Sequence, residues 1–327
     1  LGERILQLLH QKPSHIVMPA IHLKREEVGQ MFEEKGISTE KGNDDPTYLT
    51  QCARKHLRNQ FMEAGAGMTG CNFGVAKTGD IVVCTNEGNA DMSTSMPKLH
   101  LVAMGIEKIV PDYKSLAVFQ RLLCRSATGQ PTTAYTSHFR QARPGAEMHV
   151  ILVDNGRSDI LANDEHWETL KCIRCGACMN TCPVYRRSGG YAYTYFIPGP
   201  IGINLGMLHD ASRYNDNVSA CTLCLSCDNV CPAKVNPGSQ VYMWRQKLDS
   251  LHKANTMKKC MSKGMEELFD HPQLYSSALR LASLANLIPE GLTHIRTLNP
   301  WGVAHAMLNF AKESFQTMWK KGKLKEQ

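Results

Sequence analysis

Residues 172–183 read Cys172-Ile-Arg-Cys175-Gly-Ala-Cys178-Met-Asn-Thr-Cys182-Pro183, and residues 221–232 repeat the pattern as Cys221-Thr-Leu-Cys224-Leu-Ser-Cys227-Asp-Asn-Val-Cys231-Pro232. Three cysteines spaced two residues apart can wrap one face of a [4Fe-4S] cube within a tight turn, and the fourth lies three residues further on, before a proline. A proline ends a local helix and turns the chain away. The doubled run therefore predicts two [4Fe-4S] clusters.

The spacing also predicts how the eight cysteines are shared. In a run of this kind the fourth cysteine lies too far along the chain to close its own cube, so it ligates the other cluster, as in two-cluster bacterial ferredoxins. Cluster 1 is then expected to be held by Cys172, Cys175, Cys178 and Cys231. Cluster 2 is expected to be held by Cys221, Cys224, Cys227 and Cys182.

Other uses of cysteine fit less well. Structural zinc takes two cysteine pairs per site and leaves the third and fourth members of each run unexplained. Disulfides are rare in chains that show no secretion signal. Of the 13 cysteines, those outside the two runs have no common spacing and are expected to be free buried thiols in a reducing cytoplasm: Cys52, Cys71, Cys84, Cys124 and Cys260.

Composition and charge narrow the class of protein. The 327 residues are 43% hydrophobic and 20% charged, as in an ordinary globular protein, and no apolar run is long enough to form a transmembrane segment. The formal net charge is +7. Each cluster with four thiolates carries a charge of about −2, so the protein with two clusters has a net charge of about +3. With no zinc finger or ribonucleoprotein motif, we expect no nucleic-acid partner.

Residues 1–160 predict an α/β domain, with a sheet covered by helices. Asp45 and Asp112 are expected to cap the helices that follow them, and the turn at 77–80 is expected to join a hairpin. Periodicity indicates helices at 23–35, 46–64 and 113–128 and strands at 15–19, 73–76, 81–84, 99–104, 106–110, 132–136 and 148–153.

From about residue 161 the helical pattern dominates. We predict an α/β domain over 1–160, a mainly α-helical two-[4Fe-4S] ferredoxin-like domain over 161–240 and a helical extension over 241–327. An aromatic segment at 189–200, between the two runs, is expected to be a packed loop. It could shield the clusters from water, which we favour, or face a partner.

The C-terminal extension predicts a helix at 274–288 and an apolar helical stripe further on. A stripe of this kind must be covered, and three covers are open: the chain's own cluster domain, a companion subunit or a membrane surface. The stripe is formed by Val303, Met307, Phe310, Phe315, Met318 and Trp319, with a lysine-rich end after it.

Several phrases resemble the lactate utilization protein B family over nearly the whole chain. They are residues 14–22, 104–111, 125–129, 152–157, 172–178, 183–187 and 198–202, which include Met104-Gly-Ile-Glu-Lys-Ile-Val-Pro111 and Leu152-Val-Asp-Asn-Gly-Arg157. The resemblance implies a LUD domain over 1–160, akin to the NagB, ribose-isomerase and CoA-transferase group, with its first part lying upstream of Leu1. It also implies that Cys221 is the least secure ligand, because the family often keeps only the last three cysteines of the second run.

The resemblance further implies a function. Family members work with a cysteine-rich subunit and a second LUD-domain subunit, and together they oxidise L-lactate to pyruvate. The chain is then an electron-transfer subunit in the cytoplasm and not catalytic alone. A different class of function stays open, namely a ligand-binding or redox-sensing regulatory protein with structural clusters.

The sequence shows no nucleophile–base pair or phosphate-binding loop, so it identifies no catalytic residue. One polar loop directly follows a predicted strand, where α/β folds often bind ligands. Asn86, Glu87 and Asn89 could contact a small polar ligand, and Gly88 permits close approach. The alternative is an ordinary solvated turn, since asparagine and glycine are also common there.

Overall fold

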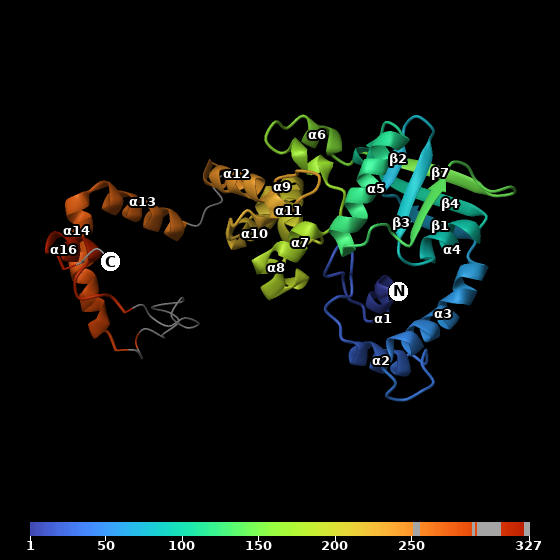
Figure 1. Cartoon of the computed structure of the whole chain (residues 1–327), viewed down its shortest axis with the longest axis horizontal. Coiled ribbons are helices and arrows are strands. Elements are labelled where there is room, and N and C mark those ends of the chain that lie inside the picture. The colour runs from blue at the N-terminus through green and yellow to red at the C-terminus, as the bar shows by residue number, and fades with distance from the viewer. Residues whose placement is uncertain (251–255, 290–291, 293–308, 324–327) are drawn as a thin grey trace. The chain divides into compact units, whose positions relative to one another are not determined.

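The computed structural model describes residues 1–250, 256–289, 292 and 309–323. The chain divides into two compact units, Leu1–Lys253 and Ala254–Gln327. The larger unit contains an α/β domain, drawn in blue to green in Figure 1, and a helical module that carries both cysteine runs, drawn in yellow-green to orange.

The α/β domain contains two small sheets. The first is all parallel, in the order β1-β4-β7, with β1 at Ala66–Gly70, β4 at Leu99–Gly105 and β7 at Glu147–Val153. The second has the order β5-β2-β3-β6, with β2 at Phe73–Val75, β3 at Asp80–Thr85, β5 at Ile109–Val110 and β6 at Tyr135–Phe139. The predicted hairpin is confirmed, because β2 and β3 pair antiparallel.

Helices precede and cover these sheets. They are α1 (Gly2–Leu8), α2 (Arg25–Glu34), α3 (Pro46–Glu63), α4 (Asn89–Ser95) and α5 (Tyr113–Thr128). Asp45 accepts a hydrogen bond from the Tyr48 amide at 2.8 Å and Asp112 accepts one from the Ser115 amide at 2.8 Å, so both predicted caps are confirmed. Gly129 ends α5 in the left-handed conformation, as expected.

Two predicted strands are wrong as drawn. Residues 15–19 form bends, because the buried ring of His15 accepts the amides of Val17 and Met18 through Nδ1, both at 3.0 Å, and so folds the segment into a compact turn. Residues 106–110 begin with the 3₁₀ helix η1 (Ile106–Lys108), and the pair that follows joins the other sheet as β5. The strand predicted at 132–136 lies later, at Tyr135–Phe139.

The helical module is built from short elements around one core. The chain enters the module through α6 (Arg157–Leu161), which ends the α/β domain. The module's own elements are η2 (Trp167–Lys171), α7 (Ala177–Thr181), α8 (Pro183–Ser188), η3 (Gly190–Ala192), α9 (Gly199–Tyr214), α10 (Asp216–Ala220), α11 (Ser226–Val230) and α12 (Pro237–Ser250). Met179, Val218, Val241 and Trp244 are buried in that core. The compact unit therefore continues past residue 240, because α12 supplies core side chains.

The first cysteine run joins the module to the α/β domain. Ile173, Cys175 and Ala177 are buried in one apolar cluster with Leu116 and Leu123 of α5. In Figure 1, α5 stands between the sheets and the module. Burial of this kind contributes about 25 cal/mol per Å² of apolar surface, so the first cysteine loop is held by the core of the preceding domain.

The C-terminal unit contains α13 (Thr256–Asp270), α14 (Pro272–Ala282), η4 (Ser283–Leu287) and α16 (Phe315–Lys320). The predicted helix at 274–288 is thus divided between α14 and η4. Of the predicted helical stripe, Val303 and Met307 lie outside the described residues, and Phe310 lies in a non-helical segment. The described part of the stripe is helical only from Phe315, whose ring stacks on that of Trp319 with the centroids 6.2 Å apart. No helix in the described ranges is long and apolar enough to cross a membrane.

Candidate iron–sulfur centres

The two cysteine runs fold into the same backbone loop. In each run the residues after the first and second cysteines include two left-handed positions: Arg174 and Gly176 have φ of 62° and 77°, and Leu223 and Leu225 have φ of 53° and 56°. A five-residue helix follows in each, α7 and α11, and ends at the fourth cysteine. Left-handed residues close the tight turn in which three cysteine side chains can face one space.

Four cysteines from both runs surround one cavity. Cys172, Cys175 and Cys178 line it from the first loop, and Cys231 lines it from the end of the second run. Its other walls include apolar side chains such as Ile201. These are the four cysteines that the spacing predicts for cluster 1, brought together from positions 172–231 by the packing of the module.

The remaining four cysteines are also neighbours. After burial, the charge on Asp228 and then the charges on Cys221 and Cys182 raise the pKa of Cys227. Burial likewise raises the pKa of Cys221, and the charges of Cys182 and Cys224 act in the same direction. Cys182, the last cysteine of the first run, therefore lies with the cysteines of the second run, as the crossed ligand sets require.

Burial makes these side chains poor thiolates on their own. It raises the pKa of Cys175 and of Cys178, and together with the Asp228 carboxylate it raises the pKa of Cys227 to about 12. Thiols in this state stay protonated at neutral pH unless a cation replaces the proton. Metal coordination deprotonates a thiol outright, so iron would supply the missing charge.

Backbone amides point at the sulfur atoms. The amides of Tyr185, Leu223 and Val235 donate to the Sγ atoms of their neighbours at 3.5, 3.4 and 3.3 Å, and the amides of Ala177 and Ile201 hydrogen bond to two further sulfurs. The five acceptors are Cys182, Cys221, Cys231, Cys175 and Cys178. Amide donors to cysteine sulfur stabilise negative charge there and tune the potential of a bound cluster.

The residues present fit two iron–sulfur clusters in donor type, in grouping and in surrounding amides. Within the described ranges, no three His, Cys, Asp or Glu side chains are grouped closely enough to hold one single metal ion. The first set of four instead surrounds a cavity with its side chains around the rim.

The two sites have different charged neighbours. Lys108 lies beside the first site. Burial and the charge of Arg174 lower the pKa of Lys108, and the nearby Cys172 raises it. Asp228 lies beside the second site, where its carboxylate accepts the Ser239 amide at 2.9 Å at the start of α12. Arg245 also lies beside the second site, where its guanidinium donates to the carbonyl of Cys221. The first site therefore has a cation beside it, and the second has an anion and a cation.

The aromatic side chains of the segment at 189–200 differ in burial. Tyr193 is 4% exposed, and its hydroxyl hydrogen bonds to the sulfur of Cys182. Tyr193 therefore covers part of Cys182, which is half-buried, in the direction of the shielding that we favour. Tyr191 and Phe196 are exposed, at 41% and 65%. The segment is a loop except for η3 and the segment's last two residues, which begin α9. The insert between the runs also contains the rest of α9 and α10.

The polar loop after β3 is held by its own hydrogen bonds. Asn86 accepts the Ala134 amide at 3.0 Å, and Asn89 accepts the hydroxyl of Thr85 at 3.2 Å. The amide of Glu87 donates to the hydroxyl of Thr85 at 3.2 Å, and Gly88 precedes α4. Ligand binding by this loop stays a prediction.

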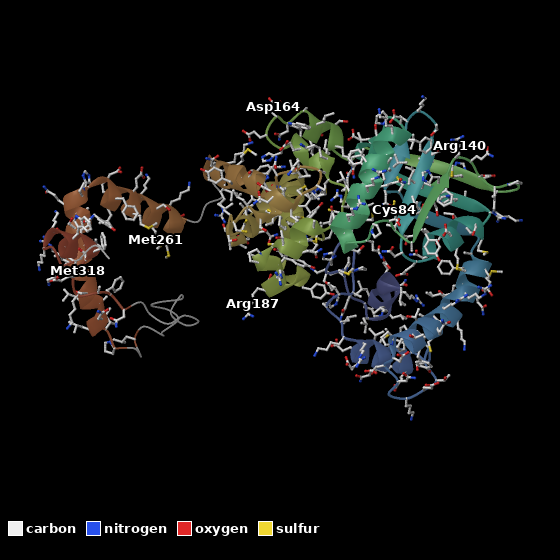
Figure 2. All side chains as sticks on the ribbon, viewed as in Figure 1. Cys84, Arg140, Asp164, Arg187, Met261 and Met318 are labelled. Carbon is white, nitrogen blue, oxygen red and sulfur yellow. The ribbon has the colours of Figure 1, made fainter. Side chains whose placement is uncertain are left out.

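The other cysteines are free thiols, but their expected burial is confirmed only for Cys124: Cys52, Cys71 and Cys84 are half-buried, and Cys260 is exposed. Burial raises the pKa of Cys71 and of Cys84 to about 11. Cys84, which is labelled in Figure 2, lies in β3 of the α/β domain. Sequence reasoning missed the role of the segment before α2: His15, which also hydrogen bonds to Asn180 at 3.2 Å, packs under Gly176 of the first loop.

Comparison with protein families defines the class of protein. Residues 1–160 match the LUD domain, and residues 168–235 match the 4Fe-4S dicluster domain. The chain is therefore a LUD-domain protein that carries a 4Fe-4S dicluster domain. The α/β domain and the helical module described above correspond to these two matches.

Curated relatives make the family specific. An uncharacterized electron transport protein of Escherichia coli, YkgF, is 36% identical over all of this chain and 70% of that protein. Lactate utilization protein B of Shouchella clausii is 37% identical over all of the chain and 70% of that protein, and that of Bacillus cytotoxicus is 45% identical over 72% and 50%. The chain belongs to the lactate utilization protein B family.

The chain spans 50–70% of the length of these relatives. No solved structure matches it.

Proposed function

We propose that this chain is the iron–sulfur electron-transfer subunit of a complex that oxidises L-lactate to pyruvate. The observation that carries the proposal is the grouping of the eight cysteines into two neighbouring sets, each with three members from one run and one from the other. The names of the relatives, a lactate utilization protein and an electron transport protein, support the pathway and the role.

The first set would hold one [4Fe-4S] cluster through Cys172, Cys175, Cys178 and Cys231. The second set would hold the other through Cys182, Cys221, Cys224 and Cys227. Such clusters supply reversible one-electron chemistry at potentials that depend on hydrogen bonds, charge and solvent exposure. The two sets are close enough for Cys227 to raise the pKa of Cys178.

The chain's own residues prepare the sites for this role. Main-chain amides donate to five of the sulfurs and so stabilise negative charge without a moving side chain. Tyr193 covers part of Cys182. The first site lies against the LUD domain through Cys175 and Ala177, so that domain can influence the cluster nearest to it.

The substrate chemistry would come from the assembled complex. We infer two companions, a cysteine-rich subunit and a second LUD-domain subunit, from the similarity of this chain to lactate utilization protein B. The free thiols outside the two sets suit a reducing compartment such as the cytoplasm.

The test is lactate-dependent dye reduction by the complex, co-expressed with both companions and purified anaerobically. Cys175→Ala should abolish at least about 90% of the rate while the subunits still co-purify, since an essential relay is interrupted. Cys260→Ala, at an exposed cysteine outside both sets, should leave the rate unchanged.

Full lactate-dependent reduction by the Cys175→Ala complex, with its iron content lowered, would contradict a relay. Partner binding that depends on the oxidation state of the clusters, without lactate-dependent electron flow, would instead favour the regulatory class of function.

A further inference from the structure

A cleft of about 650 Å³ lies where the LUD domain meets the first cysteine loop. Its walls include Glu107 and Arg157 from the LUD side and Cys172 and Arg174 from the loop. Cavities that hold cofactor-sized ligands usually measure about 300–1,000 Å³. The cleft is thus large enough for an organic ligand beside a cysteine of the first cluster set.

The LUD wall of the cleft is the carboxyl edge of the parallel sheet. β4 and β7 are neighbouring parallel strands, and the segments that leave them supply Glu107 and Arg157. Open α/β sheets bind ligands outside the carboxyl ends of their strands. The two stretches are also among those in the sequence that resemble the family, 104–111 and 152–157.

A glycine makes this edge possible. Arg157 forms an ion pair with Glu107, whose side chain is 7% exposed, and it donates to the carbonyl of Asp154 at 2.7 Å. A Cβ atom at Gly105 would lie 2.1 Å from the Glu107 carboxylate and 2.7 Å from Nε of Arg157. A side chain at position 105 would therefore displace the Glu107–Arg157 ion pair, which lines the cleft at this edge of the sheet.

Arg174 supplies a cation whose hydrogen-bonding capacity is not used up. It lines both the cavity of the first cysteine set and the cleft, and its backbone is left-handed, with φ of 62°. Its Nη1 atom is buried and has no hydrogen-bond partner among the described residues. Buried guanidinium nitrogens are normally paired, so this atom indicates an anionic partner.

The opposite wall is aromatic. Tyr195, Phe196 and Tyr214 line the cleft, with the ring centroids of Tyr195 and Phe196 4.6 Å apart and those of Tyr195 and Tyr214 5.1 Å apart. Phe196 is 65% exposed, although it belongs to a packed segment. After burial, which raises the pKa of Tyr195, Arg174 and Arg157 lower it, so both guanidinium groups lie near this wall.

We propose that this cleft binds a flat aromatic anion, with its anionic group on Arg174 and its ring against Phe196 and Tyr195. The assignment rests on the proposed function only in that Cys172 is taken as a cluster ligand. A small carboxylate alone would leave most of the cleft and the exposed ring of Phe196 unused. A ligand in this position would lie next to Cys172, where a redox partner of the first cluster must approach.

Asp159 also lines the cleft and sets a limit on the ligand's charge. Because Glu107 is neutralised by Arg157, Asp159 is the acidic group left to oppose Arg174, and it is exposed to solvent, whereas Nη1 of Arg174 is buried. One anionic group is therefore expected to enter on the Arg174 side.

Flavin mononucleotide and riboflavin form a matched pair of probes, because they share the ring and differ by the phosphate. Titration of the cluster-loaded protein, followed by quenching of flavin fluorescence, should show saturable binding of flavin mononucleotide and about tenfold weaker binding of riboflavin. Arg174→Gln should reduce that ratio to about one. Phe196→Ala should weaken both probes about threefold to tenfold, since it removes stacking area.

Arg187→Gln is the matched control. Arg187 is exposed and points outward from α8 in Figure 2, and it does not line the cleft. It should bind both probes as the unchanged protein does. Iron content is measured in every sample, and Phe196→Ala lies at an exposed side chain, so it decides the question even if Arg174→Gln loses a cluster.

The inference is overturned if the iron-loaded protein shows no saturable binding of flavin mononucleotide. Equal affinity for both probes, or a ratio unchanged by Arg174→Gln in a protein of intact iron content, would also overturn it. Each of these results leaves the electron-transfer function standing, whereas an unsubstituted protein without iron would count against that function instead.

Discussion

The two cysteine loops have one backbone and two surroundings. Both have left-handed residues at the same two places, and Cys182 and Cys231 end their short helices with φ, ψ of −71°, 118° and −68°, 114°. In the first loop one left-handed position is Gly176, which lies under His15 of the LUD domain. In the second loop the equivalent position is Leu225, which is 43% exposed.

The difference between the two loops shows which features of a cluster site come from the repeated cysteine pattern. Cysteine spacing and the left-handed turns are common to both loops, so the ability to surround a cluster is expected of both. Packing and charge are not repeated: the first loop has Lys108 and Arg174 nearby, and the second has Asp228 and Arg245. Two clusters with different potentials follow, because nearby charge shifts the potential of a cluster.

The largest effect is expected from the cysteines that cross between the loops. Cys182→Ser should remove the cluster held mainly by the second run, and Cys231→Ser should remove the one held by the first. Each variant should fall from about eight iron atoms to about four. Paramagnetic resonance of the reduced proteins distinguishes which cluster remains in each variant, because the surroundings of the two clusters differ.

If each substitution removes the cluster of its own run, the crossed sets are wrong. Cys124→Ser, at a buried cysteine outside both runs, is the control for the loss of a thiol and should retain about eight iron atoms.

A second, smaller effect should separate the equivalent left-handed positions. In Gly176→Leu the added Cβ would lie 3.0 Å from Cε1 of His15, at φ of 77°, so we expect a loss of about 1–3 kcal/mol in stability. Leu225→Gly relieves a strained backbone at an exposed site and should change stability by less than about 1 kcal/mol. Denaturant unfolding of the two loaded variants measures both, and equal destabilisation would show that the loops are equivalent after all.

The smallest effect concerns charge. Asp228→Asn keeps an acceptor for the start of α12 but removes the anion beside Cys227. The potential of the second cluster should rise by on the order of 50 mV, because one charge alters the reduction energy by about 1 kcal/mol in a partly screened site. A redox titration followed by paramagnetic resonance reads both clusters at once. A shift confined to the first cluster would contradict the placement of Asp228.

Local chemistry is what the sequence predicts well. The hairpin at β2 and β3, the caps at Asp45 and Asp112 and the end of α5 at Gly129 all depend on neighbouring residues, and all are present. Spacing also predicts how the cysteines are shared between two clusters, and the Cys182→Ser and Cys231→Ser variants test that sharing. The failed strand at residues 15–19 shows the limit, because the ring of His15 binds the amides of its own segment and its position depends on Gly176, far along the chain.

The cleft shows the same limit for a functional surface. Arg157 and Arg174 are separated by a stretch of helix and lie on different domains, and no spacing rule brings them together. The family-like stretches at 104–111 and 152–157 were the available signal. These stretches do not reveal the order of the strands in the sheet, and it is that order which places the ends of β4 and β7 side by side.

Iron and sulfide analysis with Mössbauer spectroscopy of the anaerobically purified, unsubstituted chain tests the central claim most directly. Two crossed cysteine sets predict about eight iron and about eight sulfide per chain, all in [4Fe-4S] clusters, with two distinct paramagnetic species on full reduction. About four iron atoms per chain in fully loaded protein, or zinc in their place, would contradict the account.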